Sequence, residues 1–202
     1  MTEEAGVSES PSEGPKESAA RSDVGTADGG TADGGTAVYW LWLSLGVLAA
    51  DQASKWVVTR QFELFESVAV NPYLDLTLLH NRGAAFSFLA DAGGWQRWLF
   101  IGLGIVVSVV ILFWLRRLPA RGQSWLAIGL SLVMGGALGN VIDRVHYGYV
   151  IDFIHVHYQD AYFPAFNVAD SAITVGAACL IIDALFFSGR EDAGEEGGGK
   201  EA

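Results

Sequence analysis

Four ionisable residues lie close together at one end of two long apolar stretches of this sequence. The segment GGALGNVIDRVHYGYVIDFI closes one apolar stretch, and FNVADSAITV opens the next. Together they contain three aspartates and one arginine: Asp143, Asp152, Asp170 and Arg144. A charged side chain at the centre of a membrane-spanning helix costs about 2.5–3.5 kcal/mol on insertion scales, so a charge kept there indicates a functional site.

The three aspartates have different sequence neighbours. Asp143 directly precedes Arg144 and follows Asn140 by about one helical turn, which favours an ionised, hydrogen-bonded carboxylate with a supporting role. Asp152 has only apolar immediate neighbours, and Asp170 lies inside an apolar stretch. We therefore expect Asp152 and Asp170 to be poorly solvated, as catalytic carboxyl groups often are.

If Asp152 and Asp170 face each other, they cannot both ionise at low cost, and one proton is shared between them. The ionised carboxylate then acts as a base on a water molecule that attacks a scissile carbonyl. The protonated one acts as an acid toward the oxyanion or the leaving amine. This arrangement predicts hydrolysis without a covalent intermediate. The alternative is that both acids only hydrogen-bond neighbouring helices.

Four apolar segments are expected to position these residues. Each is long enough, at about 20 residues, to cross a membrane as a helix. In the first segment Asp51 and Lys55 lie four residues apart, where they can form a structural ion pair near the membrane surface; direct contact of this DQASK motif with a ligand is the alternative. In the third, Gly135 and Gly139 allow close helix contact. The segments are 37–59, 98–115, 122–142 and 167–187.

The insert 61–94 after the first helix has a different pattern. Leucines at 74, 76 and 78 alternate with Tyr73, Asp75, Thr77 and Leu79, which predicts a strand in a small sheet. Its last part, HNRGAAFSF at 80–88, contains a glycine and two alanines. This composition suits either a tight turn or a close approach of the backbone to another chain.

The charge distribution predicts orientation and disordered tails. The chain has 202 residues and a net charge of −11, but residues 1–36 and 189–202 carry eight and five of its 23 acids. Both tails are rich in Gly and Glu and are expected to be disordered. The cluster of Arg116, Arg117 and Arg121 predicts a cytoplasmic loop. The insert 61–94 and the loop 144–166 then face outward and both tails face inward, with Asp183 solvated near the cytoplasmic end.

Composition excludes several other classes of protein. Cys179 is the only cysteine, so an internal disulfide and a cysteine metal cluster are excluded. The few basic residues outside the tails are scattered or paired with acids, so no nucleic-acid partner is expected.

Two alternative functions stay open at this point. His155 and His157 with Asp152 suggest a metal hydrolase or a lipid-phosphate transferase. On a strand, however, the two histidines share one face and Asp152 lies on the other. Intramembrane carboxylates also mark transporters and proton channels, although here they cluster at one end and no inverted repeat is evident.

Five motifs follow one another along the sequence: DQASK (51–55), NRGAAFSF (81–88), GNVIDR (139–144), VIDFI (150–154) and FNVADS (166–171). In this order and context they resemble the motifs of one family, the lipoprotein signal peptidases (signal peptidase II), over about residues 38–188. The resemblance implies a membrane all-α fold with four transmembrane helices at 37–188 and an outward β-cradle formed by the insert 61–94.

The resemblance implies an intramembrane aspartic endopeptidase of the bacterial inner membrane. It would cleave diacylglyceryl-modified prolipoproteins just before the lipobox cysteine, on the extracytoplasmic side, with Asp152 and Asp170 as catalytic residues. We expect lipidated prolipoprotein and membrane lipids as partners, a monomeric protein, and neither a metal nor a cofactor. The acidic tails and Arg82 depart from the family pattern. The substrate-binding residues implied by the resemblance are Asn81, Gly83, Asn140, Asp143, Arg144 and Asn167.

Overall fold

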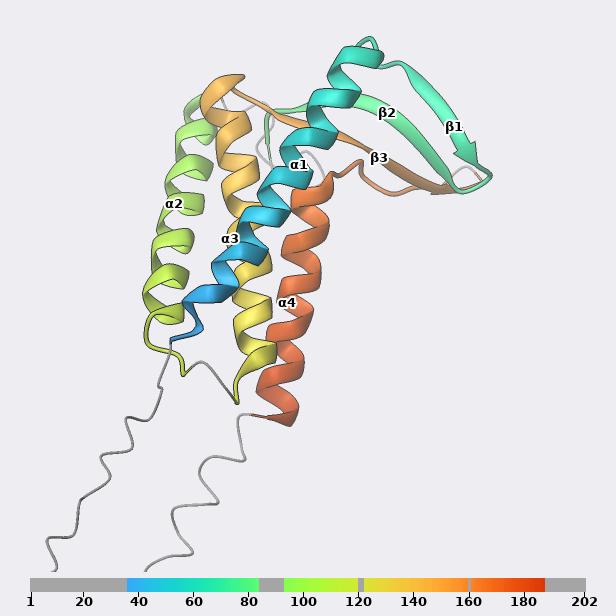
Figure 1. The fold of residues 1–202 in the computed structure, drawn as a ribbon. Coiled ribbons are helices and arrows are strands. Elements are labelled where there is room, and N and C mark those ends of the chain that lie inside the picture. Colours follow the sequence, from blue (N-terminus) through green and yellow to red (C-terminus); the bar gives the residue numbers. More distant parts are fainter. Residues whose placement is uncertain (1–35, 84–92, 120–121, 160, 188–202) are drawn as a thin grey trace, which may run out of the picture. The chain divides into compact units, whose positions relative to one another are not determined.

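The computed structural model describes residues 36–83, 93–119, 122–159 and 161–187. The expected tails, apart from Thr36, and residues 84–88 of the HNRGAAFSF segment lie outside these ranges. In the described part of the chain, four long helices lie side by side and a sheet adjoins one end of them (Figure 1). The elements are a 3-10 turn (Ala37–Trp40), α1 (Leu41–Gln61), β1 (Ser67–Asn71), β2 (Leu74–Asn81), α2 (Trp95–Leu115), α3 (Ser124–His146), β3 (Val150–Tyr158), β4 (Ala161–Tyr162) and α4 (Val168–Phe186).

Helix α3 is the central helix, since it packs against α1, α2 and α4. Its glycines make this possible. A Cβ atom added to Gly135 would lie 2.7 Å from the carbonyl oxygen of Ser44 in α1, and one added to Gly136 would collide with the carbonyl oxygen of Ala169 in α4. A Cβ atom added to Gly139 would lie 2.5 Å from Asp51 Oδ2, so the expected close contact at Gly135 and Gly139 is present against α1, and Gly136 adds a second close contact against α4.

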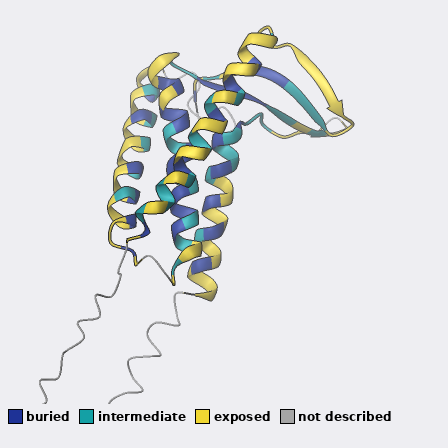
Figure 2. Ribbon diagram, viewed as in Figure 1, coloured by how far each residue is buried: buried dark blue, intermediate teal, exposed yellow. Residues whose placement is uncertain are grey.

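Figure 2 shows exposed residues along the outer surfaces of the helices, and many of these exposed residues are large and apolar. Within the described ranges, three helices are long and apolar enough to cross a membrane: α2, α3 and α4. Helix α1 is as long as α2, at 21 residues, but it is less apolar because it carries Asp51, Lys55 and Arg60. The fold is thus of the membrane type, with helices and a small antiparallel sheet.

The sheet is larger than the sequence pattern predicted. Its strand order is β1-β2-β3-β4, and all neighbours are antiparallel. Strands β3 and β4 lie in the segment 144–166, for which only a loop was expected. The first four residues of β3 are all buried, so an alternating pattern does not reveal the strand.

The expected alternation in β2 holds only in part. Leu78 belongs to a buried cluster with Val58, Ile151 and Phe153, and Leu76 packs against it. Thr77, however, is also buried, because the pairing with β3 shifts register between Leu76 and Leu79. The prediction that Asp183 is solvated was wrong, since this residue is only 8% exposed.

Candidate active site

Asp152 lies on β3 in a nearly closed environment. It is 3% exposed, and each of its carboxylate oxygens accepts a hydrogen bond from a side-chain amide. Asn81 Nδ2 donates to Oδ2 at 3.0 Å, and Asn167 Nδ2 donates to Oδ1 at 2.7 Å. Asn81 comes from the last position of β2, which pairs with Val150 at the start of β3. The pairing of β2 with β3 therefore positions this amide.

Asp170 lies in the first turn of α4, where it closes a capping box with Asn167. The side-chain oxygen of Asn167 accepts from the Asp170 N–H at 2.9 Å, and Asp170 Oδ2 accepts from the Asn167 N–H at 3.3 Å. This reciprocal pair satisfies two backbone donors that a helix start leaves free. The other oxygen of Asp170 accepts from Asn140 Nδ2 of α3 at 2.8 Å.

Asn167 joins the two aspartates, because its side chain donates to the carboxylate of Asp152 and accepts from the backbone N–H of Asp170. It is fully buried, at 0% exposure. Burial, followed by the negative charge of Asp170, raises the pKa of Asp152 to about 7, while the amides of Asn81 and Asn167 oppose this shift. At neutral pH, Asp152 can therefore hold or release a proton within reach of the charge of Asp170.

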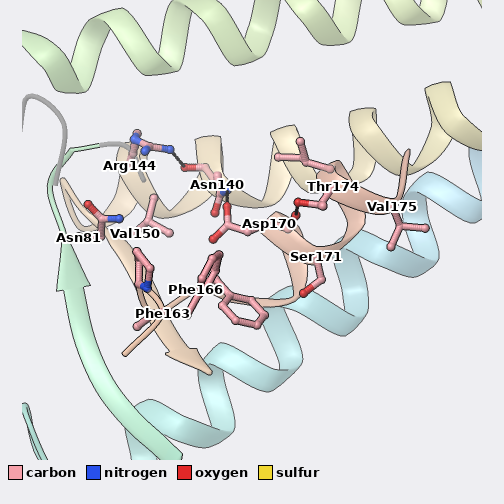
Figure 3. A pocket seen from close by; sticks show the side chains of 13 residues that line it. Asn81, Asn140, Arg144, Val150, Phe163, Phe166, Asp170, Ser171, Thr174 and Val175 are labelled. Atoms are coloured by element: carbon pink, nitrogen blue, oxygen red, sulfur yellow. Dashed lines mark hydrogen bonds between the residues drawn. The ribbon is translucent and has the colours of Figure 1, made fainter. Parts of the chain in front are cut away.

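A cavity of about 480 Å³ opens beside Asp170. Figure 3 shows Asn140 of α3 and Asp170 of α4 pointing toward each other at its polar end, with Asn81 and Arg144 nearby. Asp152 does not line this cavity. The remaining lining residues are mostly apolar: Val150, Phe163, Pro164, Ala165, Phe166, Ser171, Ile173, Thr174 and Val175.

A buried ionic network lies next to the two candidate aspartates. Lys55 Nζ is 2.8 Å from both Asp51 Oδ2 and Asp143 Oδ2, and the three side chains are 2%, 0% and 1% exposed. The expected pair of Asp51 and Lys55 is thus present, but it is enclosed by protein and includes a second carboxylate. Lys55 Nζ also donates to Asn140 Oδ1 at 3.3 Å.

Each carboxylate of this network holds the backbone beside one candidate catalytic residue. Asp51 Oδ1 accepts from the N–H of Ala169, the residue before Asp170, at 2.9 Å. Asp143 Oδ2 accepts from the N–H of Ile151, the residue before Asp152, at 3.1 Å. The network therefore connects α1 and α3 to the segments that carry Asp170 and Asp152. It thereby fixes the position of these two aspartates relative to each other.

Arg144 does not pair with Asp143, its neighbour in sequence. Its guanidinium donates to the carbonyl oxygen of Gly83 at 2.9 Å and to that of Asn140 at 3.4 Å, and it lies 4.8 Å from the ring centre of Phe100. Successive residues of a helix point about 100° apart, so Asp143 turns to α1 while Arg144 turns to α2.

The structure separates the six expected substrate-binding residues into two groups. Asn81, Asn140 and Arg144 line the cavity. Asp143 and Asn167 do not, since both are buried and fully engaged in hydrogen bonds with the protein. Gly83 is buried and holds Arg144 through its carbonyl oxygen.

Sequence reasoning missed two parts of the site. Gln52 Nε2 donates to Asp143 Oδ1 at 3.0 Å and lies 3.2 Å from Asp51 Oδ2, so it belongs to the ionic network. Residues 163–166 form the apolar wall of the cavity. Residues 163–165 directly precede the FNVADS motif and Phe166 is its first residue, and this position is a signal that could have found them.

The two histidines on β3 contact Tyr162 and Asp75 in place of Asp152. The rings of His155 and His157 lie 5.0 and 5.1 Å from that of Tyr162, and His157 Nε2 is 3.4 Å from Asp75 Oδ1. Asp152 is paired with Leu79 in the sheet. Among the described residues, no group of three or more His, Cys, Asp or Glu side chains is arranged to hold a metal ion.

The fold resembles two solved structures, both described as bacterial membrane enzymes. One is 28% identical, covers 82% of this chain and 94% of its own, and has a TM-score of 0.67. The other is 30% identical, covers 75% and 94%, and has a TM-score of 0.63. An apolar helical fold, with the half-buried carboxylate of Asp170 in its cavity and the buried carboxylate of Asp152 outside the lining, thus defines the class of a membrane enzyme.

Comparisons of sequence identify the family. The profile of the family described as signal peptidase (SPase) II matches residues 43–186. A lipoprotein signal peptidase of Pseudomonas fluorescens is 60% identical over 146 residues, which are 71% of this chain and 85% of the relative. Another, of Acinetobacter baylyi, is 52% identical over 149 residues, or 73% and 83%.

The chain therefore belongs to the signal peptidase II family, the proteases that remove the signal peptide from prolipoproteins. The resemblance seen in the five sequence motifs is confirmed, and so is the expectation of an aspartic peptidase. The alternative of a transporter or proton channel was wrong, because the family is one of enzymes.

Proposed function

We propose that Asp152 and Asp170 are the catalytic pair of this peptidase, and that it cleaves diacylglyceryl-modified prolipoproteins just before the lipobox cysteine. One observation carries this proposal. The side chain of Asn167 donates to the Asp152 carboxylate and accepts from the Asp170 N–H, so that one amide joins two aspartates of separate elements, and Asp170 lines the polar end of an apolar cavity. No metal and no cofactor enters the mechanism.

The reaction needs one proton shared by the two carboxyl groups. The ionised member takes a proton from a water molecule as the water oxygen attacks the carbonyl carbon of the scissile peptide bond. The tetrahedral intermediate then collapses, the C–N bond breaks, and the protonated member gives its proton to the leaving amine nitrogen. The pKa of about 7 at Asp152 fits this exchange, because both protonation states are accessible at neutral pH.

The cavity suits a substrate that has a large apolar part and a peptide backbone that polar groups of the protein can hold by hydrogen bonds. The apolar side chains of residues 163–166 and 173–175 can take the apolar part of a lipidated signal peptide. Asn81, Asn140 and Arg144 supply amide and guanidinium groups for its backbone. We assign Asn167 and Asp143 to positioning Asp152, and Gly83 to positioning Arg144.

We also propose that α1 crosses the membrane, which makes four spans. Its charges are compatible with this role, since Asp51 and Lys55 are 0% and 2% exposed and neutralise each other inside the protein. Arg116 and Arg117 between α2 and α3 support a cytoplasmic location of that end, because short loops rich in Lys and Arg stay in the cytoplasm. Both termini are then cytoplasmic, and the sheet and cavity face the extracytoplasmic side of the bacterial inner membrane. The protein acts as a monomer in contact with membrane lipids.

The test is the pair of substitutions Asp152→Asn and Asp170→Asn in the full chain. We expect each to reduce cleavage of a diacylglyceryl prolipoprotein by at least about 10³-fold, because general acid–base catalysis contributes 10²–10⁴-fold and neither residue can replace the other. Asp75→Asn, on β2 next to His157, is the matched control and should keep the cleavage rate. Substantial turnover by either Asn variant, with the control active, would refute the catalytic pair.

A further inference from the structure

A second pocket, which shares no lining residue with the active-site cavity, lies at the first turn of α2. Its volume is about 550 Å³. It is bounded by the end of β2, by the start of α2 and by the turn that follows α3. The described residues that line it are Arg82, Gly93, Gly94, Gln96, Arg97, Trp98, Tyr147, Gly148 and Tyr149.

Among its described lining residues, the pocket carries positive charge that no carboxylate balances. Two of the described lining residues are arginines, and none is an aspartate or glutamate. Arg82 is exposed. Arg97 uses one guanidinium nitrogen, Nη2, to donate to the carbonyl oxygen of Val145 at 2.9 Å. Its Nε atom is buried and, within the described part of the chain, has no hydrogen-bond partner. A buried donor without an acceptor costs about 1–3 kcal/mol, so a ligand that accepts from it would be favoured.

The backbone of the turn makes room for the Arg97 guanidinium. Gly148 has a φ of +86°, which side-chain-bearing residues rarely adopt, and a Cβ atom there would lie 3.4 Å from Arg97 Nη1. The aromatic rings of Tyr147 and Tyr149 are stacked, with centres 5.8 Å apart, and form one side of the pocket. Arg97 therefore lies in a shaped recess between its own helix and this turn.

The position of Trp98 indicates which molecules can reach the pocket. Trp98 lines it, is 67% exposed, and has its ring centre 5.2 Å from the Arg97 guanidinium carbon. It lies in the first turn of α2, a candidate membrane span. Exposed tryptophans at the end of a span lie at the level of the lipid headgroups. The two arginines are thus placed at the depth of the phosphate groups of the bilayer.

We propose that this pocket binds the phosphate group of an anionic membrane phospholipid through Arg82 and Arg97. Guanidinium groups match phosphate oxygens in charge and geometry and can donate two parallel hydrogen bonds. The bound lipid would stabilise the segment 81–83, which supplies Asn81 and the Gly83 carbonyl oxygen to the active site. The lipid acts as a structural ligand beside the site of cleavage, in addition to the substrate in the cavity.

The test compares lipid retention by the full chain and its Arg82→Gln and Arg97→Gln variants. Native mass spectrometry of protein in mixed micelles with phosphatidylglycerol measures the bound lipid. We expect each variant to weaken phosphatidylglycerol binding about tenfold, the effect of losing one charge-assisted contact. Arg60→Gln is the charge-matched control. Arg60 is exposed and lies over Trp56 on α1. The Arg60→Gln variant should therefore retain as much lipid as the unmodified chain.

Two further experiments complete the test. Competition by inorganic phosphate distinguishes a lipid phosphate from a free phosphate ion, and thermal unfolding checks that the variants are folded. Inorganic phosphate at millimolar concentration should not displace phosphatidylglycerol; displacement would show a site for free anions and overturn the proposal. Arg82 is exposed, so its substitution should leave the thermal unfolding midpoint unchanged. Equal lipid retention by Arg82→Gln, Arg97→Gln and the control would also overturn the proposal.

Discussion

Removal of the Lys55 charge tests whether the ionic network supports the active site. Lys55→Met keeps the approximate length of the side chain but leaves Asp51 and Asp143 as buried carboxylates without a cation. Breaking a buried pair in this way costs about 3–5 kcal/mol. Because these carboxylates also hold the N–H groups of Ala169 and Ile151, cleavage should fall together with stability.

Equilibrium unfolding in mixed micelles measures the loss of stability, and a prolipoprotein cleavage assay measures the effect on the site. Arg60→Met is the matched control, because Arg60 lies further along the same helix and is exposed. Its substitution should change the unfolding free energy by less than about 0.5 kcal/mol.

A triple variant separates lost charge balance from lost packing. Asp51→Asn, Lys55→Met and Asp143→Asn together remove all three charges but keep an oxygen that can accept from Ala169 and Ile151. This variant should recover most of the stability that Lys55→Met loses, since a buried pair replaced as a unit costs little. An unchanged unfolding free energy in Lys55→Met, or no recovery in the triple variant, would refute the reasoning.

Three more predictions concern the pH dependence of cleavage, the pH dependence of stability and the helix contacts. The pKa of Asp152 is raised to about 7, chiefly by burial and then by Asp170, so the cleavage rate should fall as the pH rises above about 7. The Asn81 amide lowers this pKa, so Asn81→Leu should move the fall to higher pH in a pH–rate profile; an unmoved profile contradicts this. The unfolding free energy should decrease between pH 3.8 and about 7, because folded Asp152 keeps a proton that the unfolded chain releases. Gly136→Ala places a Cβ against the Ala169 carbonyl and should cost about 1–3 kcal/mol in unfolding experiments. Gly46→Ala, with no atom within 4 Å of its new Cβ, should cost nothing, and equal losses in the two variants would count against the packing argument.

The amino-acid sequence alone indicated which segments are helices and which residues we propose as the catalytic pair. Long apolar runs bounded by charges predicted α2, α3 and α4 to within a few residues, because a membrane span needs a minimum apolar length. Asp152 and Asp170 stood out since ionisable groups in apolar surroundings are costly unless they have a use. The period-two pattern predicted β2, because one face of that strand packs on the helices.

The tertiary structure decided which of these residues meet. Asp143 was expected to act beside Arg144, but its partner is Lys55, 88 positions earlier in the chain. The first four residues of β3 show no alternation in burial, because protein covers both faces of the strand there. The pocket around Arg97 joins residues from three separate segments. Local sequence specifies the face on which a side chain lies, but its neighbour there is set by helix and strand packing, which depends on contacts distant in sequence.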